Sequence, residues 1–308
     1  LYVPAGSAPL FSTVLMLAIP AKLAGCREVI MCSPPDATGK VNAATLYAAR
    51  LCGVTRVYKI GGAQAIAAMA YGTESVPSVY KIFGPGNQYV TEAKLQVMRT
   101  GVAIDMPAGP SEVALLADES CVPSFVAADL LSQAEHGPDS QVVLVSISER
   151  VIAETMEEMQ QQLESLPRND IARTALVNSK AILVESLADG MELVNSYAPE
   201  HLIIATEDSE RVAEMVTNAG SVFIGNYSCE SAGDYASGTN HTLPTNGAAR
   251  AYSGVSVASF MKTITYQKLS EGGIRNLGPV IETLAAAECL DAHKNAVAIR
   301  LNAETRTK

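Results

Sequence analysis

The sequence predicts an α/β fold in which two units with parallel sheets are followed by a short helical C-terminal region. Short β-branched runs alternate with segments of helical spacing at intervals of about 25 residues along most of the chain. Such alternation is typical of parallel sheets with helices on both faces, because a crossover segment must join consecutive parallel strands. The length of 308 residues also allows about two domains.

Each element is assigned from its local pattern. Apolar, β-branched runs predict strands at 28–32, 56–60, 81–83, 102–105, 113–117, 141–147, 181–184, 202–205 and 221–224. Helical spacing predicts helices at 42–51, 65–70, 90–98, 124–136, 149–163 and 210–219. The small and apolar residues 7–25 contain Pro9, Pro20 and Lys22, which favours a buried helix over a membrane span.

Breaks in this pattern predict the domain boundaries. Two prolines and a glycine interrupt the alternation at 107–111, and strand patterns stop after about Tyr252. We therefore expect domains at residues 1–111, 112–252 and 253–308. The last region has helical pieces at 258–263 and 279–289 and an apolar-alternating segment at 296–301. It is too short to bury its own core, so we expect it to pack on another domain or subunit.

Composition excludes several classes of function. The formal net charge is −10, and no basic run occurs, which argues against binding to nucleic acid or to an anionic membrane surface. The six cysteines are scattered without Cys-x-x-Cys spacing. They are typical of reduced thiols, so we expect a cytoplasmic protein.

The four histidines lie in polar surroundings that indicate one functional site. A neutral imidazole with carboxylates suits zinc, and imidazole–acid pairs suit proton transfer near neutral pH. Gln133 and His136 are three residues apart at the end of a predicted helix, where both could bind a metal. The alternative is a histidine that stabilises the helix C-terminus. The histidines are His136, His201, His241 and His293.

Two further segments are candidates for the same site. Asp234 and His241 lie in a small-residue segment after the strand at 221–224, so we expect a ligand site at the carboxyl ends of the strands, although ordinary turns are the alternative. Glu200 and His201 precede the strand at 202–205. A shared role requires an irregular turn, which Pro199 favours, and the alternative is an exposed strand start.

Two glycine-rich segments, 61–64 and 84–87, each join a predicted strand to a predicted helix. Backbone N–H groups at such junctions can bind phosphate. Neither segment fits the dinucleotide fingerprint G-x-G-x-x-G, so tight turns are the alternative.

Taken together, these segments resemble the histidinol dehydrogenase family over essentially the whole chain. The resemblance implies two incomplete Rossmann-like domains with a C-terminal tail, and it implies that the family's N-terminal segment is missing. Departures from the family pattern are Ala5 before Gly6, Cys229 and Asn246. The matching stretches are 60–70, 81–87 (ending Gly-Pro-Gly-Asn), 104–113, 129–141 (containing Gln-Ala-Glu-His-Gly), 198–204, 219–223, 230–241 and 290–297.

The resemblance implies a zinc enzyme that oxidises L-histidinol to L-histidine with two NAD, through an enzyme-held aldehyde. It implies Glu200 and His201 as the acid–base pair. It also implies an intertwined homodimer with a shared active site, to which the partner subunit supplies His293. The implied zinc ligands are Gln133, His136, Asp234 and His293; the further substrate contacts are Ser111, His201 and Glu288; and the NAD contacts are Tyr2, Gln64 and Asn87.

Two other functions fit the same residues. A zinc hydrolase could use Gln133, His136, Asp234 and Glu200, but it would not need NAD. The second is a non-enzymatic ligand-binding α/β protein, in which replacement of Glu200 or His201 would cause no loss of turnover because there is none.

Overall fold

The computed structural model describes residues 1–5 and 9–303, so Ala5, the first departure from the family pattern, is described and Gly6 after it is not. Leu1–Met261 form one compact unit and Lys262–Lys308 a second, and each is described here by itself. Within the described residues, no helix combines the length and the apolar character needed to cross a membrane.

The first part of the larger unit contains two short parallel strand pairs, β1 with β2 and β3 with β4. The N-terminal residues lie between them, because Tyr2 donates its N–H to the carbonyl of Phe83 and Val3 donates to that of Cys32. Gly84 has φ +132°, and a Cβ there would overlap the carbonyl oxygen of Tyr2, so this approach requires glycine. The strands are β1 (Ile30–Cys32), β2 (Arg56–Tyr58), β3 (Lys81–Ile82) and β4 (Ala103–Ile104), and the helices are α1 (Phe11–Leu23), α2 (Ala43–Cys52), α3 (Gly62–Tyr71) and α4 (Gln88–Met98).

The second part is built on a five-stranded, fully parallel sheet in the order β7-β6-β5-β8-β9. Its central strand β5 and the neighbouring β8 are buried along their whole length, as expected for a sheet covered on both faces. Val113 of β5 pairs with His201, the first residue of β8. The strands are β5 (Glu112–Ala117), β6 (Gln141–Ser146), β7 (Lys180–Leu183), β8 (His201–Ala205) and β9 (Ser221–Ile224).

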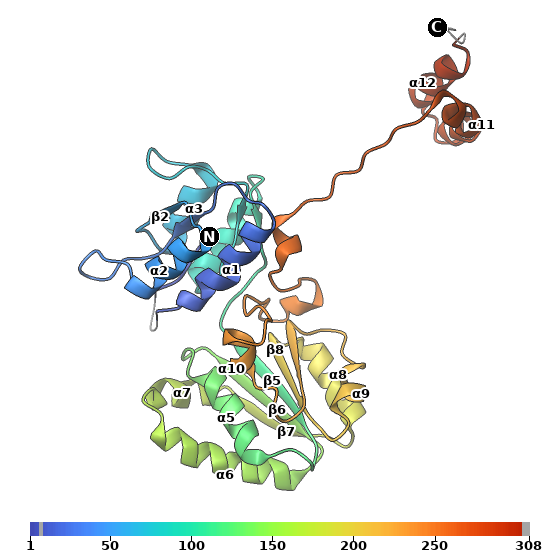
Figure 1. The fold of residues 1–308 in the computed structure, drawn as a ribbon. Helices are drawn as coiled ribbons and strands as arrows, with labels where there is room; N and C mark the ends of the chain where they lie inside the picture. Colours follow the sequence, from blue (N-terminus) through green and yellow to red (C-terminus); the bar gives the residue numbers. More distant parts are fainter. Residues whose placement is uncertain (6–8, 304–308) are drawn as a thin grey trace. The chain divides into compact units, whose positions relative to one another are not determined.

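Helices cover the two faces of this sheet (Figure 1). Val113 and Leu115 point to the face covered by α5 and α6, whereas Ala114 and Leu116 point to the face covered by α8, as the period of two along a strand requires. The first face carries α5 (Pro123–Ala134), α6 (Glu149–Ser165) and α7 (Asn169–Leu176), and the second carries α8 (Leu187–Tyr197) and α9 (Ser209–Ala213).

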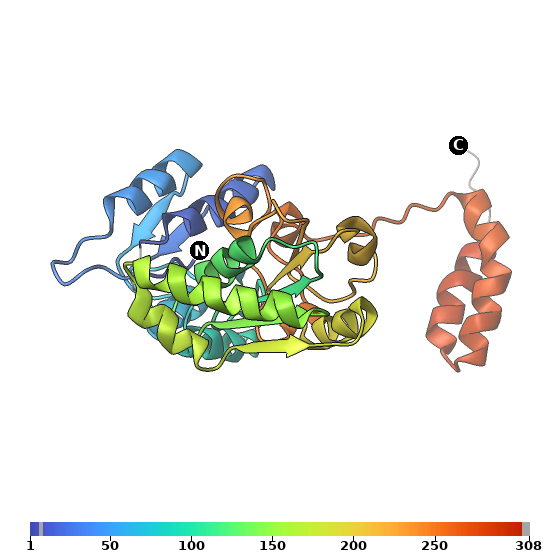
Figure 2. The ribbon, with the colours of Figure 1, turned by 90° about the horizontal axis from the view of Figure 1, so that it is seen from below.

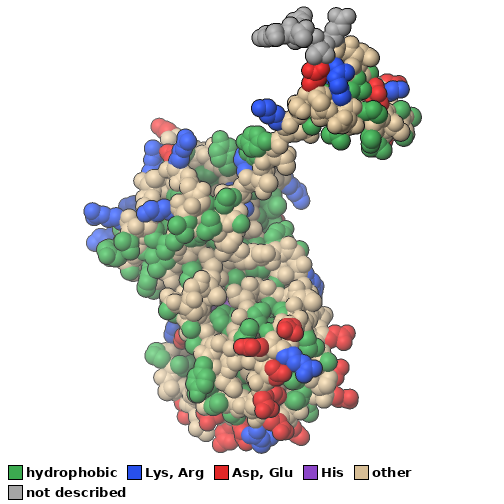
Figure 3. Space-filling view, turned by 45° about the vertical axis from the view of Figure 1, so that its right-hand side comes forward, with side chains coloured by type: hydrophobic (Ala, Val, Ile, Leu, Met, Phe, Trp, Pro, Cys, Tyr) green, Lys and Arg blue, Asp and Glu red, His purple; other side chains and the backbone are tan. Residues whose placement is uncertain are grey.

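The smaller unit is a helical hairpin of α11 (Glu271–Ala287) and α12 (Asp291–Leu301), which lie side by side (Figure 2). Residues 262–270 before it form neither helix nor strand and are all exposed. Leu277, Val280 and Leu284 of α11 are exposed as well, and apolar side chains are visible on the surface of the hairpin (Figure 3). The hairpin therefore leaves apolar surface uncovered.

The predicted fold class is confirmed, and the differences are local. The sequence did not predict α7 and α8. The helix expected at 210–219 ends at Ala213, because the side chain of Asn195 accepts the N–H groups of Thr217 and Asn218 and holds that segment in turns. The helix expected from residue 279 begins eight residues earlier, at Glu271, and Pro279 lies inside it. The domain boundaries at 111 and 252 stay predictions.

Candidate active site

The candidate site lies at the amino ends of β5 and β8. Glu200 and His201 stand at the start of β8, and Glu112 begins β5 beside them. Asp234 was expected at the carboxyl end of the strand at 221–224, but it lies 4.0 Å from His201, which pairs with the first residue of that strand, so it faces the amino edge instead. The physical reason is that α5 runs back along the sheet, so that its last turn, with Gln133, returns to the amino edge.

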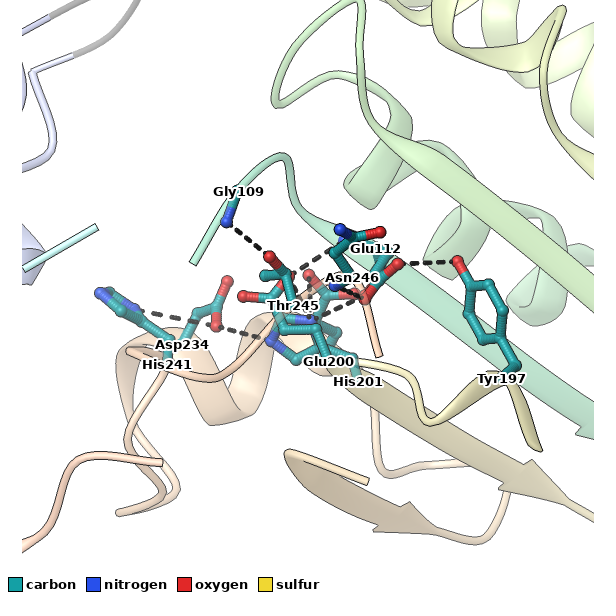
Figure 4. Close-up of polar contacts among 10 residues, drawn as sticks. Gly109, Glu112, Tyr197, Glu200, His201, Asp234, His241, Thr245 and Asn246 are labelled. Carbon is teal, nitrogen blue, oxygen red and sulfur yellow. Dashed lines mark hydrogen bonds and ion pairs between the residues drawn. The ribbon is translucent and has the colours of Figure 1, made fainter. Parts of the chain in front are cut away.

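His201 is a buried, neutral imidazole. Its side chain is 4% exposed, and its Nδ1 lies 3.2 Å from the carbonyl oxygen of Glu112, so the hydrogen assigned to Nδ1 donates to that oxygen. Its Nε2 has no hydrogen-bond partner within the described chain and lies 4.0 Å from Oδ1 of Asp234 (Figure 4). Burial lowers the pKa of His201 to about 3, so the Nε2 lone pair is free near neutral pH.

Glu200 points into the same interior as His201. Its Oε2 accepts the N–H of Glu112 at 3.0 Å and lies 3.6 Å from Nδ1 of His201. Glu200 is only 5% exposed and sits in a bend after Pro199, so the irregular turn expected here is present and the exposed strand start is not. Burial, with the nearby carboxylates, raises the pKa of Glu200 well above 4.5.

A cluster of possible metal ligands faces this pair. His136, Glu230 and Asp234 each offer one ligand atom, and these atoms lie within 4.8 Å of one another. Glu230 and Asp234 belong to α10 (Glu230–Tyr235), where a separation of four residues places them on one face. Burial raises the pKa of Asp234 to about 6 and that of Glu230 well above its usual range.

Gln133 is fully buried and belongs to the same cluster. The amide orientation that satisfies its hydrogen bonds directs its nitrogen to both carboxylate oxygens of Glu230, at 3.2 and 2.5 Å. Its oxygen is then left to serve as a ligand. Glu230 was not predicted from the sequence, although its spacing of four residues from Asp234 was a usable signal.

The other two histidines of the larger unit lie next to Asp234 or Gln133. His241 has its Nδ1 3.8 Å from Oδ1 of Asp234, and burial lowers the pKa of His241 to about 4. His136 lies just beyond the end of α5, where its N–H donates to the carbonyl of Gln133. Because it follows the last helical turn, its exposed ring joins the cluster from the end of the helix.

The predicted NAD contacts gather at two helix N-termini. Tyr2 is buried, and its hydroxyl oxygen accepts the N–H of Gly62 at the start of α3. Gln64 is exposed in the first turn of that helix. Asn87 caps α4 by accepting the N–H groups of Tyr89 and Val90.

The remaining predicted residues are placed as follows. Ser111 is half-buried directly before β5, and its carbonyl accepts the N–H of Gln141 at 3.2 Å. Glu288 caps the end of α11 and His293 lies in α12, both exposed on the smaller unit. Both residues belong to the smaller unit, whereas the ligand cluster belongs to the larger one.

A buried, neutral imidazole beside a buried carboxyl group and a ligand cluster, carried by parallel α/β sheets, defines an α/β enzyme. The family model of histidinol dehydrogenase matches residues 1–301. The chain belongs to the histidinol dehydrogenase family, and it is an NAD-dependent oxidoreductase that oxidises histidinol in histidine biosynthesis.

Individual relatives agree with this assignment. Histidinol dehydrogenase of Bacteroides thetaiotaomicron is 65% identical over 302 residues, which cover 98% of this chain and 71% of the relative. That of Xanthomonas campestris pv. campestris is 61% identical over 302 residues, covering 98% and 70%. The chain thus spans about 70% of the length of these relatives.

Solved structures show the same likeness. The crystal structure of histidinol dehydrogenase from Elizabethkingia anophelis has a TM-score of 0.95 and 59% identity, covering 97% of this chain and 69% of that one. An acetylating aldehyde dehydrogenase from Geobacillus thermoglucosidasius has a TM-score of 0.56 at 14% identity, covering 87% and 75%, and shares the fold.

Proposed function

We propose that the chain oxidises L-histidinol to L-histidine in two NAD-dependent steps through an enzyme-held aldehyde. The observation that carries this proposal is the unpaired Nε2 of His201, buried next to Glu200 and 4.0 Å from Asp234. An unpaired acceptor in so closed a place is costly unless a substrate group binds to it.

In the first step, His201 acts as general base. Its Nε2 takes the proton of the substrate hydroxyl while hydride leaves the carbon, so that the alcohol becomes an aldehyde. The hydrogen bond between Nδ1 and the carbonyl of Glu112 keeps the ring in the tautomer that can accept this proton. The pKa of about 3 keeps His201 neutral before each turnover.

In the second step, Glu200 activates water. Its carboxylate takes a proton from the water whose oxygen adds to the aldehyde carbon, and a second hydride then leaves the hydrated carbon to give the carboxylic acid. NAD, when bound, accepts the hydride in each step. Tyr2, Gln64 and Asn87 are the residues we propose to contact it, since they gather at helix N-termini, where backbone N–H groups suit phosphate.

The ligand cluster fits zinc. Gln133, His136 and Asp234 would hold it with His293 of the partner subunit, because amide oxygen, imidazole and carboxylate are donors that zinc accepts. Zinc, when bound, orients the amine and imidazole of the substrate. Ser111, His201 and Glu288 would contact the substrate beside these ligands.

We further propose a homodimer that shares its active sites through the C-terminal unit. Leu277, Val280 and Leu284 lie at helical spacing on α11 and are all exposed. A partner surface that packed against them would remove this apolar area from water. Residues 262–270 are exposed throughout, as expected for an arm that reaches another subunit.

A stoichiometric assay tests the reaction. The purified protein with zinc, histidinol and excess NAD should form two NADH for each histidinol consumed, because both steps release hydride. The measurement is absorbance of NADH against histidine formed. If NAD stays unreduced with histidinol and zinc, the oxidation is wrong and a zinc hydrolase of another substrate is favoured. Binding of histidinol without any NADH would favour a ligand-binding protein.

Glu230 should affect metal binding without being indispensable for folding. The change Glu230→Gln replaces one carboxyl oxygen of the cluster by an amide nitrogen, and with it one of the two oxygens that orient the Gln133 amide. We expect zinc affinity to fall by about 10- to 100-fold. Competition with a chromogenic chelator measures this affinity. The control is Glu157→Gln on the exposed side of α6, which should leave zinc affinity unchanged; equal affinities for both variants would contradict the role of Glu230.

A further inference from the structure

The main chain of Glu112 contacts both members of the acid–base pair. Its N–H donates to Oε2 of Glu200 at 3.0 Å, and its carbonyl oxygen lies 3.2 Å from Nδ1 of His201. One residue of β5 therefore sets the direction of the carboxyl group and the tautomer of the imidazole at the same time. A shift of this residue along or away from β8 would disturb both contacts.

The side chain of Glu112 is buried and bonded to two other segments (Figure 4). Its Oε2 accepts the hydroxyl of Tyr197 at 2.9 Å, and its Oε1 accepts the N–H of Asn246 at 2.6 Å. The hydroxyl of Tyr197 also lies 2.7 Å from Oε1 of Gln141, the first residue of β6. The carboxyl group is thus at the centre of a hydrogen-bond network that joins β5, β6, α8 and the loop at Asn246.

These segments are the ones that meet at the site. Tyr197 is the last residue of α8, and only Ala198, in the left-handed conformation, and Pro199 separate it from Glu200. Asn246 follows Thr245, whose Oγ1 accepts the N–H of Gly109 at 2.6 Å and so ties this loop to the segment before β5. The Glu112 carboxyl group therefore anchors the helix end, the loop and the strand around the acid–base pair.

We propose that Glu112 is the positioning residue of the acid–base pair, acting on Glu200 and His201 through its main chain while its carboxyl group fixes that main chain in place. The proposal rests on the proposed roles of Glu200 and His201. Its physical basis is that proton and hydride transfer need reacting groups at contact distance, so that small displacements cost much of the rate. Glu112 itself has no contact with the substrate in the proposed mechanism.

Replacement of the side chain should lower turnover more than substrate binding. We expect Glu112→Ala and Tyr197→Phe to lower kcat by about 10- to 100-fold while KM for histidinol changes by less than about threefold, because geometry is lost but the ligand cluster remains. Glu112→Gln should recover most of kcat, since an amide still accepts the Asn246 N–H and still bonds the Tyr197 hydroxyl. Steady-state kinetics of the full chain measure these effects.

A matched control separates positioning from stability. Asn195 also lies on α8, where it bonds Met215, Thr217 and Asn218, away from Glu200. Asn195→Ala should lower the melting temperature without lowering kcat. The proposal is wrong if Glu112→Ala and Tyr197→Phe keep the wild-type kcat, if Asn195→Ala loses as much kcat as they do, or if Glu112→Gln is as impaired as Glu112→Ala. If Glu112→Ala does not fold, Tyr197→Phe alone decides by the same criterion.

Two further variants in the same assay distinguish a failure of the positioning role of Glu112 from a failure of the acid–base roles of Glu200 and His201. Full turnover in both Glu200→Gln and His201→Asn would overturn the acid–base roles, and the positioning role with them. Lost turnover in these two variants with wild-type turnover in Glu112→Ala and Tyr197→Phe would overturn the positioning role alone.

Discussion

Glu200→Gln and His201→Asn should each lower turnover of histidinol to histidine by about 10²–10⁴, the range typical of a lost general base. Glu200→Gln keeps the size of its buried side chain, and His201→Asn keeps a polar group that can donate to the carbonyl of Glu112, so the fold should tolerate them. The measurement is NADH formation at saturating histidinol and NAD, with the melting temperature as the check on folding. A folded variant that turned over at the wild-type rate would remove that residue from the mechanism.

The two variants should differ in the step that fails. Glu200→Gln retains the His201 base, so it should release the first hydride and then stall before water adds. A single-turnover experiment should therefore show one rapid equivalent of NADH per site in Glu200→Gln and a slow first equivalent in His201→Asn. Equal slowing of the first equivalent in both variants would contradict the division of work between them.

The pH dependence follows from the same two groups. Burial raises the pKa of Glu200 well above 4.5, and below this pKa the carboxyl group is protonated and cannot accept the proton of water. Oxidation of the aldehyde should therefore fall as pH drops through the raised pKa. His201 has a pKa of about 3, so it remains neutral over that range and does not limit the step. The acid limb of the profile should belong to Glu200 and be absent from the residual activity of Glu200→Gln.

Sequence patterns predicted the elements of the fold because those elements follow local rules. The apolar runs at 113–117 and 202–205 became the buried strands β5 and β8, as continuous hydrophobic character requires in a parallel sheet. The pairing of β5 with both β6 and β8 depends on contacts between distant residues, which no local pattern contains. The edge of the sheet that carries the site was mistaken for the same reason.

Candidate site residues were predictable where the type of side chain alone indicates a role. They were not predictable where the role depends on contacts that only the fold creates. His201 and Asp234 became candidates because the chain has only four histidines and each lies in a polar segment. Glu112 looked like the polar start of a strand, and only the fold brings its main chain to Glu200 and its side chain to Tyr197. Glu230 was missed because α10 was interpreted as a loop, which hid its helical spacing from Asp234.

Mixed dimers should regain activity if the active site is shared between subunits. The variants His136→Ala and His293→Ala should each be nearly inactive alone, because each lacks a proposed zinc ligand. In a dimer that pairs the two, one site combines both defects and the other combines two intact halves. Dimers that pair the two variants should therefore show roughly half of the wild-type activity, since one of their two sites is intact.

The matched control pairs two defects from the same half of the site. Gln133→Ala and His136→Ala both lie in the larger unit, so every site of their mixed dimer carries one of them and no activity should return. The two mixtures are prepared by co-expression with different tags, and NADH formation is measured on dimers that carry both tags. Recovery in the first mixture alone requires that His293 reaches the site of the partner subunit. If neither mixture recovers although both tags are recovered together, each chain supplies its own four ligands, and the exposed face of α11 must be covered by some other contact.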